Sequence, residues 1–162
     1  MSEVARILLV DDDESIRKTF SAALEGEGYV VDIAENGKEA IQKAEANFYN
    51  LALVDIRLPD MEGTQVLAAM KETTPKMVKI IVTGYPSLQN AVEAVNKGAD
   101  GYIIKPTKMN ELLKTVREHL KKQQEAKEFG EGKIQEFIET RIKELAENEE
   151  RSPTKPPSLE QK

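Results

Sequence analysis

Short apolar runs alternate with amphipathic stretches between residues 5 and 126. Five runs have the length and composition of buried strands, namely Ile7–Val10, Tyr29–Ile33, Leu51–Val54, Val78–Val82 and Gly101–Ile104. Apolar residues at helical spacing predict helices over 14–27, 36–46, 63–71, 87–96 and from about residue 108 onward. Because parallel strands need crossover connections, this alternation predicts an α/β fold, a parallel sheet with helices on both faces.

Polar residues close four of the five predicted strands. Asp11 and Asp12 follow the first strand and Asp55 follows the third, while Thr83 and Lys105 follow the fourth and fifth. An open parallel sheet binds ligands at the carboxyl ends of its strands, so we expect these side chains to meet in one pocket.

Three carboxylates in one cleft repel one another, and a divalent cation relieves that repulsion. Mg²⁺, with Mn²⁺ as an alternative, suits a site with few carboxylates because it keeps water and phosphate oxygens as ligands. Asp55 stands alone opposite the pair Asp11 and Asp12. It is therefore the better nucleophile for an acyl phosphate, while Lys105 and Thr83 contact phosphoryl oxygens.

Composition excludes several classes of function. The chain has 162 residues, a formal net charge of −6 and no cysteine, which rules out disulfides and thiolate chemistry. An acidic chain without a basic stripe is a poor nucleic-acid binder. No signal peptide or long apolar segment is visible, so we expect a cytoplasmic protein that does not insert into membranes.

The composition changes after residue 126. Phe129–Gly132, with two glycines, predicts a break, and residues 133–148 predict a second amphipathic helix. Residues 150–162 carry three prolines among polar residues and are expected to be disordered. We therefore expect three parts, 1–126, 127–149 and 150–162. The apolar stripe of the second helix has three open readings: it packs on the first domain, pairs with a second copy, or binds another protein.

Four segments together resemble the receiver domain of two-component response regulators. They are residues 7–13 (ILLVDDD), 54–63 (VDIRLPDMEG), 82–84 (VTG) and 98–106 (GADGYIIKP). Their order and spacing match that family over residues 5 to about 123. The resemblance implies a doubly wound, flavodoxin-like sheet of five parallel strands in the order 2-1-3-4-5.

The resemblance also implies roles for the acidic residues. Asp55 would accept a phosphoryl group from a sensor histidine kinase or phosphotransferase. Asp11, Asp12 and the backbone carbonyl of Arg57 would bind Mg²⁺. The Arg57 and Tyr85 side chains occupy positions that tune the dephosphorylation rate in the family.

The remaining implied roles concern the phosphoryl group and the response to it. Lys105 would contact phosphoryl oxygens, and Thr83 would move toward them. Tyr102 would swing inward together with Thr83. The Lys105–Pro106 peptide bond is expected to be cis, which proline makes accessible.

These features favour a phosphoacceptor switch that catalyses only its own phosphorylation and dephosphorylation. Its output would be a protein contact, a homodimer or onward transfer in a relay. The fourth helix, fifth strand and fifth helix would form the contact surface, or the C-terminal helix would. The region after residue 126 is too small for a DNA-binding output domain.

Two alternatives remain. One is a Mg²⁺-dependent phosphatase of the haloacid dehalogenase type, because Asp11-x-Asp13-x-Ser15 resembles its opening motif. The chain lacks the acidic pair that this family needs after its lysine. The other alternative is an inactive receiver-like scaffold, against which the complete set of strand-end residues argues.

Overall fold

The computed structural model describes residues 3–151, which divide into two units at Gln123 and Gln124. The elements in chain order are β1 (Arg6–Val10), α1 (Glu14–Gly26), β2 (Val30–Ala34), α2 (Gly37–Ala46), β3 (Leu51–Val54), α3 (Gly63–Ala69), β4 (Val78–Thr83), α4 (Leu88–Asn96), β5 (Gly101–Ile104) and α5 (Met109–Arg151). All five strands and the first part of α5 belong to the first unit.

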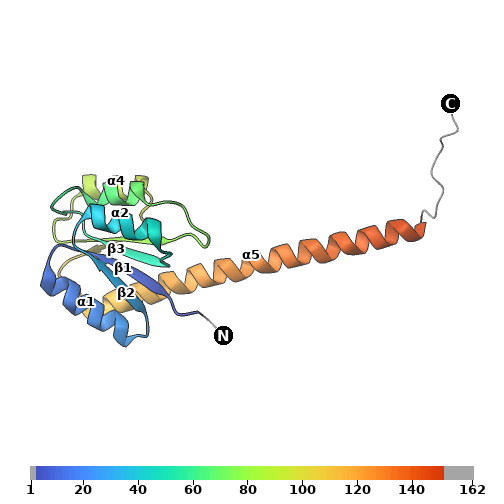
Figure 1. Cartoon of the computed structure of the whole chain (residues 1–162), viewed down its shortest axis with the longest axis horizontal. Coiled ribbons are helices and arrows are strands. Elements are labelled where there is room, and N and C mark those ends of the chain that lie inside the picture. Colours follow the sequence, from blue (N-terminus) through green and yellow to red (C-terminus); the bar gives the residue numbers. More distant parts are fainter. Residues whose placement is uncertain (1–2, 152–162) are drawn as a thin grey trace, which may run out of the picture. The chain divides into compact units, whose positions relative to one another are not determined.

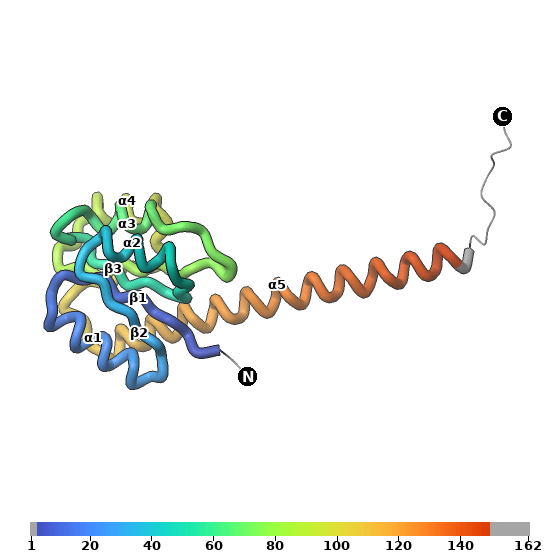
Figure 2. The backbone as a smooth tube through the Cα atoms, in the orientation of Figure 1, coloured from blue at the N-terminus to red at the C-terminus, as the bar shows by residue number. Residues whose placement is uncertain are grey.

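The sheet has five strands in the order β2-β1-β3-β4-β5, and every pair is parallel. Figure 2 shows β1 between β2 and β3. Val10 pairs with Ala34 on β2 and with Val54 on β3, so these three strands end at one level. The predicted fold and strand order are confirmed, and the register brings the residues after β1 and β3 side by side.

Two apolar layers cover the two faces of the sheet. One layer packs Leu8 and Val54 against α2, α3 and α4, and the other packs Leu9 and Leu53 against α1 and the start of α5. Figure 1 shows α2 and α4 on one side of the strands and α1 on the other. Successive side chains of a strand point to opposite faces. The central strands β1 and β3 are therefore apolar along almost their whole length.

Apart from the end of α5, element boundaries lie within two residues of the predicted ones, and two of the one-residue differences concern polar residues. Thr83 is the last residue of β4 and does not lie beyond it, because it pairs with Ile104 and its carbonyl accepts the Lys105 N–H at 2.8 Å. Ser87 lies outside α4 and caps it, accepting a hydrogen bond from the Asn90 N–H.

The predicted break at Phe129–Gly132 is wrong, because α5 continues through these residues. A glycine ends a helix when it adopts positive φ just beyond the last turn. Gly28 and Gly98 do so after α1 and α4, whereas Gly130 and Gly132 are not among the positive-φ residues. A glycine inside a helix keeps its N–H and costs only about 1 kcal/mol relative to alanine, which a long helix tolerates.

The described part of the second unit, residues 124–151, is helical throughout. Its large apolar side chains are between 47% and 70% exposed, and they are Phe129, Ile134, Phe137, Ile138, Ile142 and Leu145. Residues 150 and 151, the first of the predicted tail, belong to α5, and the rest of that tail lies outside the described residues. Within residues 3–151, no helix is long and apolar enough to cross a membrane.

Candidate functional site

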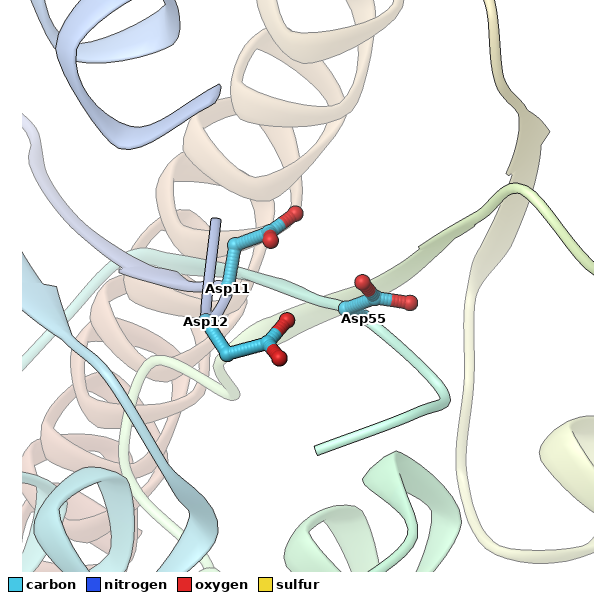
Figure 3. A group of neighbouring side chains, drawn as sticks. All are labelled: Asp11, Asp12 and Asp55. Atoms are coloured by element: carbon cyan, nitrogen blue, oxygen red, sulfur yellow. The ribbon is translucent and has the colours of Figure 1, made fainter. Parts of the chain in front are cut away.

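Three carboxylates meet at the carboxyl ends of β1 and β3. Asp11 and Asp12 follow β1, and Asp55 follows the neighbouring strand β3. One carboxylate oxygen from each lies within 4.8 Å of the others, and Figure 3 shows the three side chains gathered at these strand ends. The backbone reinforces this arrangement, since the Asp55 N–H donates to the Val10 carbonyl at 3.0 Å.

Lys105, directly after β5, bridges two of these carboxylates. Its Nζ lies 2.6 Å from Asp11 Oδ2 and 3.1 Å from Asp55 Oδ2. The lysine side chain is only 17% exposed, so water screens these ion pairs weakly. The Lys105–Pro106 peptide bond is cis.

Burial and neighbouring charges shift the pKa values of Asp55 and Lys105. Burial raises the pKa of the Asp55 carboxyl, and the Asp11 charge adds to this, so the pKa stays above its ordinary value although Lys105 opposes the change. Burial alone would lower the pKa of Lys105, but hydrogen bonds and charges from Asp11 and Asp55 outweigh it and raise that pKa. A second cation beside Asp55 would therefore be stabilised.

Asp11 and Asp12 differ although they are adjacent. Asp11 is 3% exposed, and both of its carboxylate oxygens are engaged, Oδ1 by the Asp13 N–H at 2.9 Å and Oδ2 by Lys105. Asp12 is exposed, and within residues 3–151 its carboxylate accepts no hydrogen bond and forms no ion pair. Asp12 thus offers oxygen donors to a ligand from solution.

Arg57 contacts Asp55, and Tyr85 links Arg57 to Thr83. Thr83 is fully buried, and its Oγ1 accepts the Tyr85 N–H at 3.0 Å. The Arg57 N–H donates to Asp55 Oδ1 at 3.3 Å. The Arg57 guanidinium lies 3.9 Å from the centroid of the Tyr85 ring, close enough for a cation–π contact.

Tyr102, on β5, packs against the core layer that contains α4. Its hydroxyl is buried and has no hydrogen-bond partner among the described residues. Burying a hydroxyl without a partner costs free energy, so a ring position that gave this hydroxyl a partner would be favoured.

An open cleft of about 780 Å³ lies over these strand ends. It is lined by Asp11, Asp12, Asp13, Ile16, Phe20, Asp55, Arg57, Gly84, Tyr85, Lys105, Pro106 and Thr107. Most of the predicted site residues therefore share one cleft, whereas Thr83 and Tyr102 are not among its lining residues.

Sequence reasoning missed two residues at the site. A Cβ on Gly63 would overlap the Asp55 carbonyl group, so only glycine allows α3 to begin so close to the acceptor candidate. Arg17 is buried and donates to the Asp11 carbonyl at 2.8 Å. Its signal in the sequence was its place on the apolar face of α1 with Phe20 and Leu24.

Comparison with known proteins gives the family. The family model described as the response regulator receiver domain matches residues 7–117. The chain belongs to this family. It is therefore a receiver domain of the two-component response regulators over most of its first unit. Receiver domains are phosphoacceptor switches that bind Mg²⁺ in an acidic pocket and interact with histidine kinases or phosphotransferases.

Curated relatives are longer proteins. The transcriptional regulatory protein ZraR of Klebsiella oxytoca is 40% identical over 118 residues, which cover 73% of this chain and 27% of that protein. The regulatory protein AtoC of Escherichia coli (strain K12) is 34% identical over 129 residues, 80% of this chain and 28% of AtoC. The chain thus matches about a quarter of the length of these two regulators.

Two solved receiver domains are matched by this chain over almost their whole length. A CheY-like receiver domain protein from Methanospirillum hungatei JF-1 is 48% identical with a TM-score of 0.74, covering 76% of this chain and 99% of that one. The receiver domain of a putative LuxO repressor protein from Vibrio parahaemolyticus is 32% identical with a TM-score of 0.70, covering 75% and 94%.

Proposed function

We propose that Asp55 accepts a phosphoryl group in a Mg²⁺-dependent reaction and that this receiver thereby switches protein contacts. The observation that carries the proposal is the Lys105 bridge to Asp11 and Asp55, set beside the exposed carboxylate of Asp12. This arrangement brings together a nucleophile (Asp55), a buried cation (Lys105) and a carboxylate that can coordinate a metal ion (Asp12). The haloacid dehalogenase alternative gives Asp55 no role, so the geometry favours the switch.

The donor set fits a hard divalent cation. Asp11, Asp12 and the backbone carbonyl of Arg57 would hold it, because Mg²⁺ and Mn²⁺ prefer oxygen ligands. When bound, the cation supplies positive charge that lowers the repulsion among the carboxylates and neutralises phosphoryl oxygens. The raised pKa of Asp55 reflects the same need for positive charge.

The chain's own groups then carry out the transfer. An Asp55 oxygen attacks phosphorus and forms the acyl phosphate bond, the bond from phosphorus to the donor nitrogen or oxygen breaks, and its electron pair leaves with the donor. Lys105 stays charged at neutral pH because its pKa is raised, so it can hold a phosphoryl oxygen. Thr83 Oγ1 would donate to another after giving up its contact with Tyr85.

We assign the response to Thr83 and Tyr102. Inward movement of Thr83 opens space, and the buried Tyr102 hydroxyl gains from any second position that offers it a partner. The surface that would change carries exposed apolar side chains on α4 and β5, namely Leu88, Val92, Val95 and Ile104. This surface would contact an output protein or a second copy.

We assign the lifetime of the acyl phosphate to Arg57 and Tyr85. Their stacked side chains line the cleft beside Asp55 and limit the approach of water to phosphorus. Removing either partner would leave the other without its contact, so the rate effects of the two substitutions would not add.

The donor would be a sensor histidine kinase or a phosphotransferase in the cytoplasm, and the C-terminal helix offers a second contact surface for a homodimer. We propose no direct contact with nucleic acid, because the chain has a formal net charge of −6.

Labelling with acetyl phosphate tests the acceptor. The wild-type chain should take up acid-stable, base-labile phosphate only when Mg²⁺ is present, and Asp55→Asn should abolish it. Asp100→Asn is the matched control, because Asp100 precedes β5 at the opposite end of the sheet, and it should label normally. Labelling that persists in Asp55→Asn and disappears in Asp11→Asn would contradict the proposal and favour the phosphatase alternative.

A further inference from the structure

Arg17 is a buried cation whose contacts lead to the backbone of the acidic cluster. It is 9% exposed and occupies the apolar face of α1. Its Nη1 donates to the Asp11 carbonyl at 2.8 Å, and its Nη2 lies 3.4 Å from Glu35 Oε1. The Glu35 side chain is 64% exposed, so this ion pair contributes little. The Asp11 carbonyl is therefore the only buried partner that the guanidinium has among the described residues, and the Glu39 charge also acts on it.

The carbonyl that Arg17 holds belongs to the peptide between Asp11 and Asp12. On the other side of Asp11, its N–H donates to the Ala34 carbonyl at 3.1 Å. Hydrogen bonds thus fix the backbone on both sides of Asp11. The Asp12 carboxylate has no hydrogen bond of its own among the described residues. The direction in which it points therefore depends on the peptide that Arg17 fixes.

We propose that Arg17 is a positioning residue for the divalent cation, acting through the Asp11–Asp12 peptide. This inference rests on the proposed Mg²⁺ site. Arg17 does not touch the cation; it holds the Asp12 carboxylate in the orientation that brings its oxygen near those of Asp11 and Asp55. Groups that orient metal ligands in this way typically change metal affinity by about 10- to 100-fold when they are removed.

Mg²⁺ titration of the full chain by calorimetry tests the proposal. Arg17→Met should raise the dissociation constant for Mg²⁺ about tenfold or more. Arg17→Lys keeps the positive charge and N–H donors but loses the planar guanidinium, so its dissociation constant should fall between those of wild type and Arg17→Met. Glu35→Gln removes the ion pair and leaves the carbonyl contact, so it should bind like wild type. Arg117→Met, at an arginine side chain that is 55% exposed, is the matched control and should also bind like wild type.

A metal-free measurement separates positioning from folding. The backbone ¹³C′ resonance of Asp11 and the ¹⁵N resonance of Asp12 report the hydrogen bond to this carbonyl. Both should shift in Arg17→Met and keep their positions in Glu35→Gln. If Arg17→Met does not fold, the comparison is made with Arg17→Lys, which should show weaker binding and the same resonances displaced to a smaller extent.

The outcomes are distinguishable. Wild-type protein that binds no Mg²⁺ would overturn the metal site itself, and with it the proposed function. Wild-type protein that binds Mg²⁺ while the folded Arg17 variants bind it equally well would overturn only the role of Arg17. A variant with lowered thermal stability and unchanged affinity would show that Arg17 serves the fold alone.

Discussion

Leu24 and Leu145 are the same residue type in two helical regions with opposite surroundings. Leu24, in α1, is completely buried against the sheet, and Leu145, in the second unit, is 51% exposed. Amphipathic sequence patterns predict both helices equally well. The contrast shows that the pattern identifies an apolar face but not what covers it.

The two regions also differ in what stabilises them. The helices of the first unit bury their apolar faces in two continuous layers. Residues 124–149 have local contacts, including Gln135 with Glu139 at 2.9 Å and Arg141 with Glu144 at 3.1 Å. Such exposed pairs contribute about 0.2–0.5 kcal/mol each. We therefore expect the second unit to gain most of its stability from whatever covers its apolar face.

The largest expected effect comes from the same truncation in the two regions. Leu24→Ala should lower the free energy of unfolding of the first unit by about 2–5 kcal/mol, because it leaves a cavity in the core. Leu145→Ala should change it by less than about 0.5 kcal/mol. All four tyrosines lie in the first unit, so tyrosine fluorescence during urea unfolding reports that unit alone. Equal losses of unfolding free energy in Leu24→Ala and Leu145→Ala would contradict the difference in burial between the two helical regions.

Two glycine substitutions should change stability by smaller amounts and in opposite directions. Gly63→Ala should destabilise the first unit by about 1–3 kcal/mol, because the Asp55 carbonyl occupies the space of the new methyl group. Apart from its chain neighbours and the backbone of its own helix, nothing lies within 4 Å of a Cβ placed on Gly130, so Gly130→Ala should stabilise its helix by up to about 1 kcal/mol. Urea unfolding measures the first change and far-ultraviolet circular dichroism the second. Helicity that falls in Gly130→Ala would mean that the backbone there is not simply helical.

The smallest effect compares a buried and an exposed carboxylate within the first unit. The pKa of Asp55 is raised by burial, so its ionisation destabilises metal-free protein above its ordinary pKa and has no effect at lower pH. The pKa of Asp60 is lowered by the Gly37 and Lys38 N–H groups, so its ionisation stabilises the fold above its ordinary pKa, and this is lost as pH falls through the lowered pKa. With EDTA at pH 7, Asp55→Asn should raise the melting temperature and Asp60→Asn should lower it.

Both differences should vanish in strongly acidic solution, where the wild-type carboxyls are protonated in the folded and unfolded states. Melting curves measured from neutral to acidic pH check this. If Asp55→Asn lowers the melting temperature at pH 7, the Lys105 ion pair outweighs burial and the assigned direction is wrong.

The location of the strand-end residues could be predicted from sequence, because short apolar runs identify the buried strands and each polar residue directly follows such a run. A short apolar run followed by an acid needs only a parallel sheet to bring Asp11 and Asp55 together. The predicted end of β4 fell one residue before Thr83, because the end of a strand depends on its pairing with a neighbouring strand. The apolar run alone does not reveal that pairing. Arg17 was missed because its role depends on a carbonyl that only the folded backbone brings to it.

The continuous path of α5 through Gly130 and Gly132 was missed for another reason. Glycine gives the same local signal whether it ends a helix or only weakens it. The difference lies in φ, which the following residues and their packing decide. The sequence also cannot separate the three readings of the apolar stripe of residues 133–148, because Leu24 and Leu145 follow the same helical pattern.

The lysine bridge has a consequence for the order of events at the site. Four aspartates (Asp11, Asp12, Asp13 and Asp55) line the cleft together with Lys105 and Arg57, so its formal charge is −2, which would repel an incoming phosphoryl dianion. A bound divalent cation would bring that balance to zero. Bound Mg²⁺ should thus be a precondition for phosphorylation. The receiver would then be phosphorylated only where the free Mg²⁺ concentration is high enough to fill its metal site.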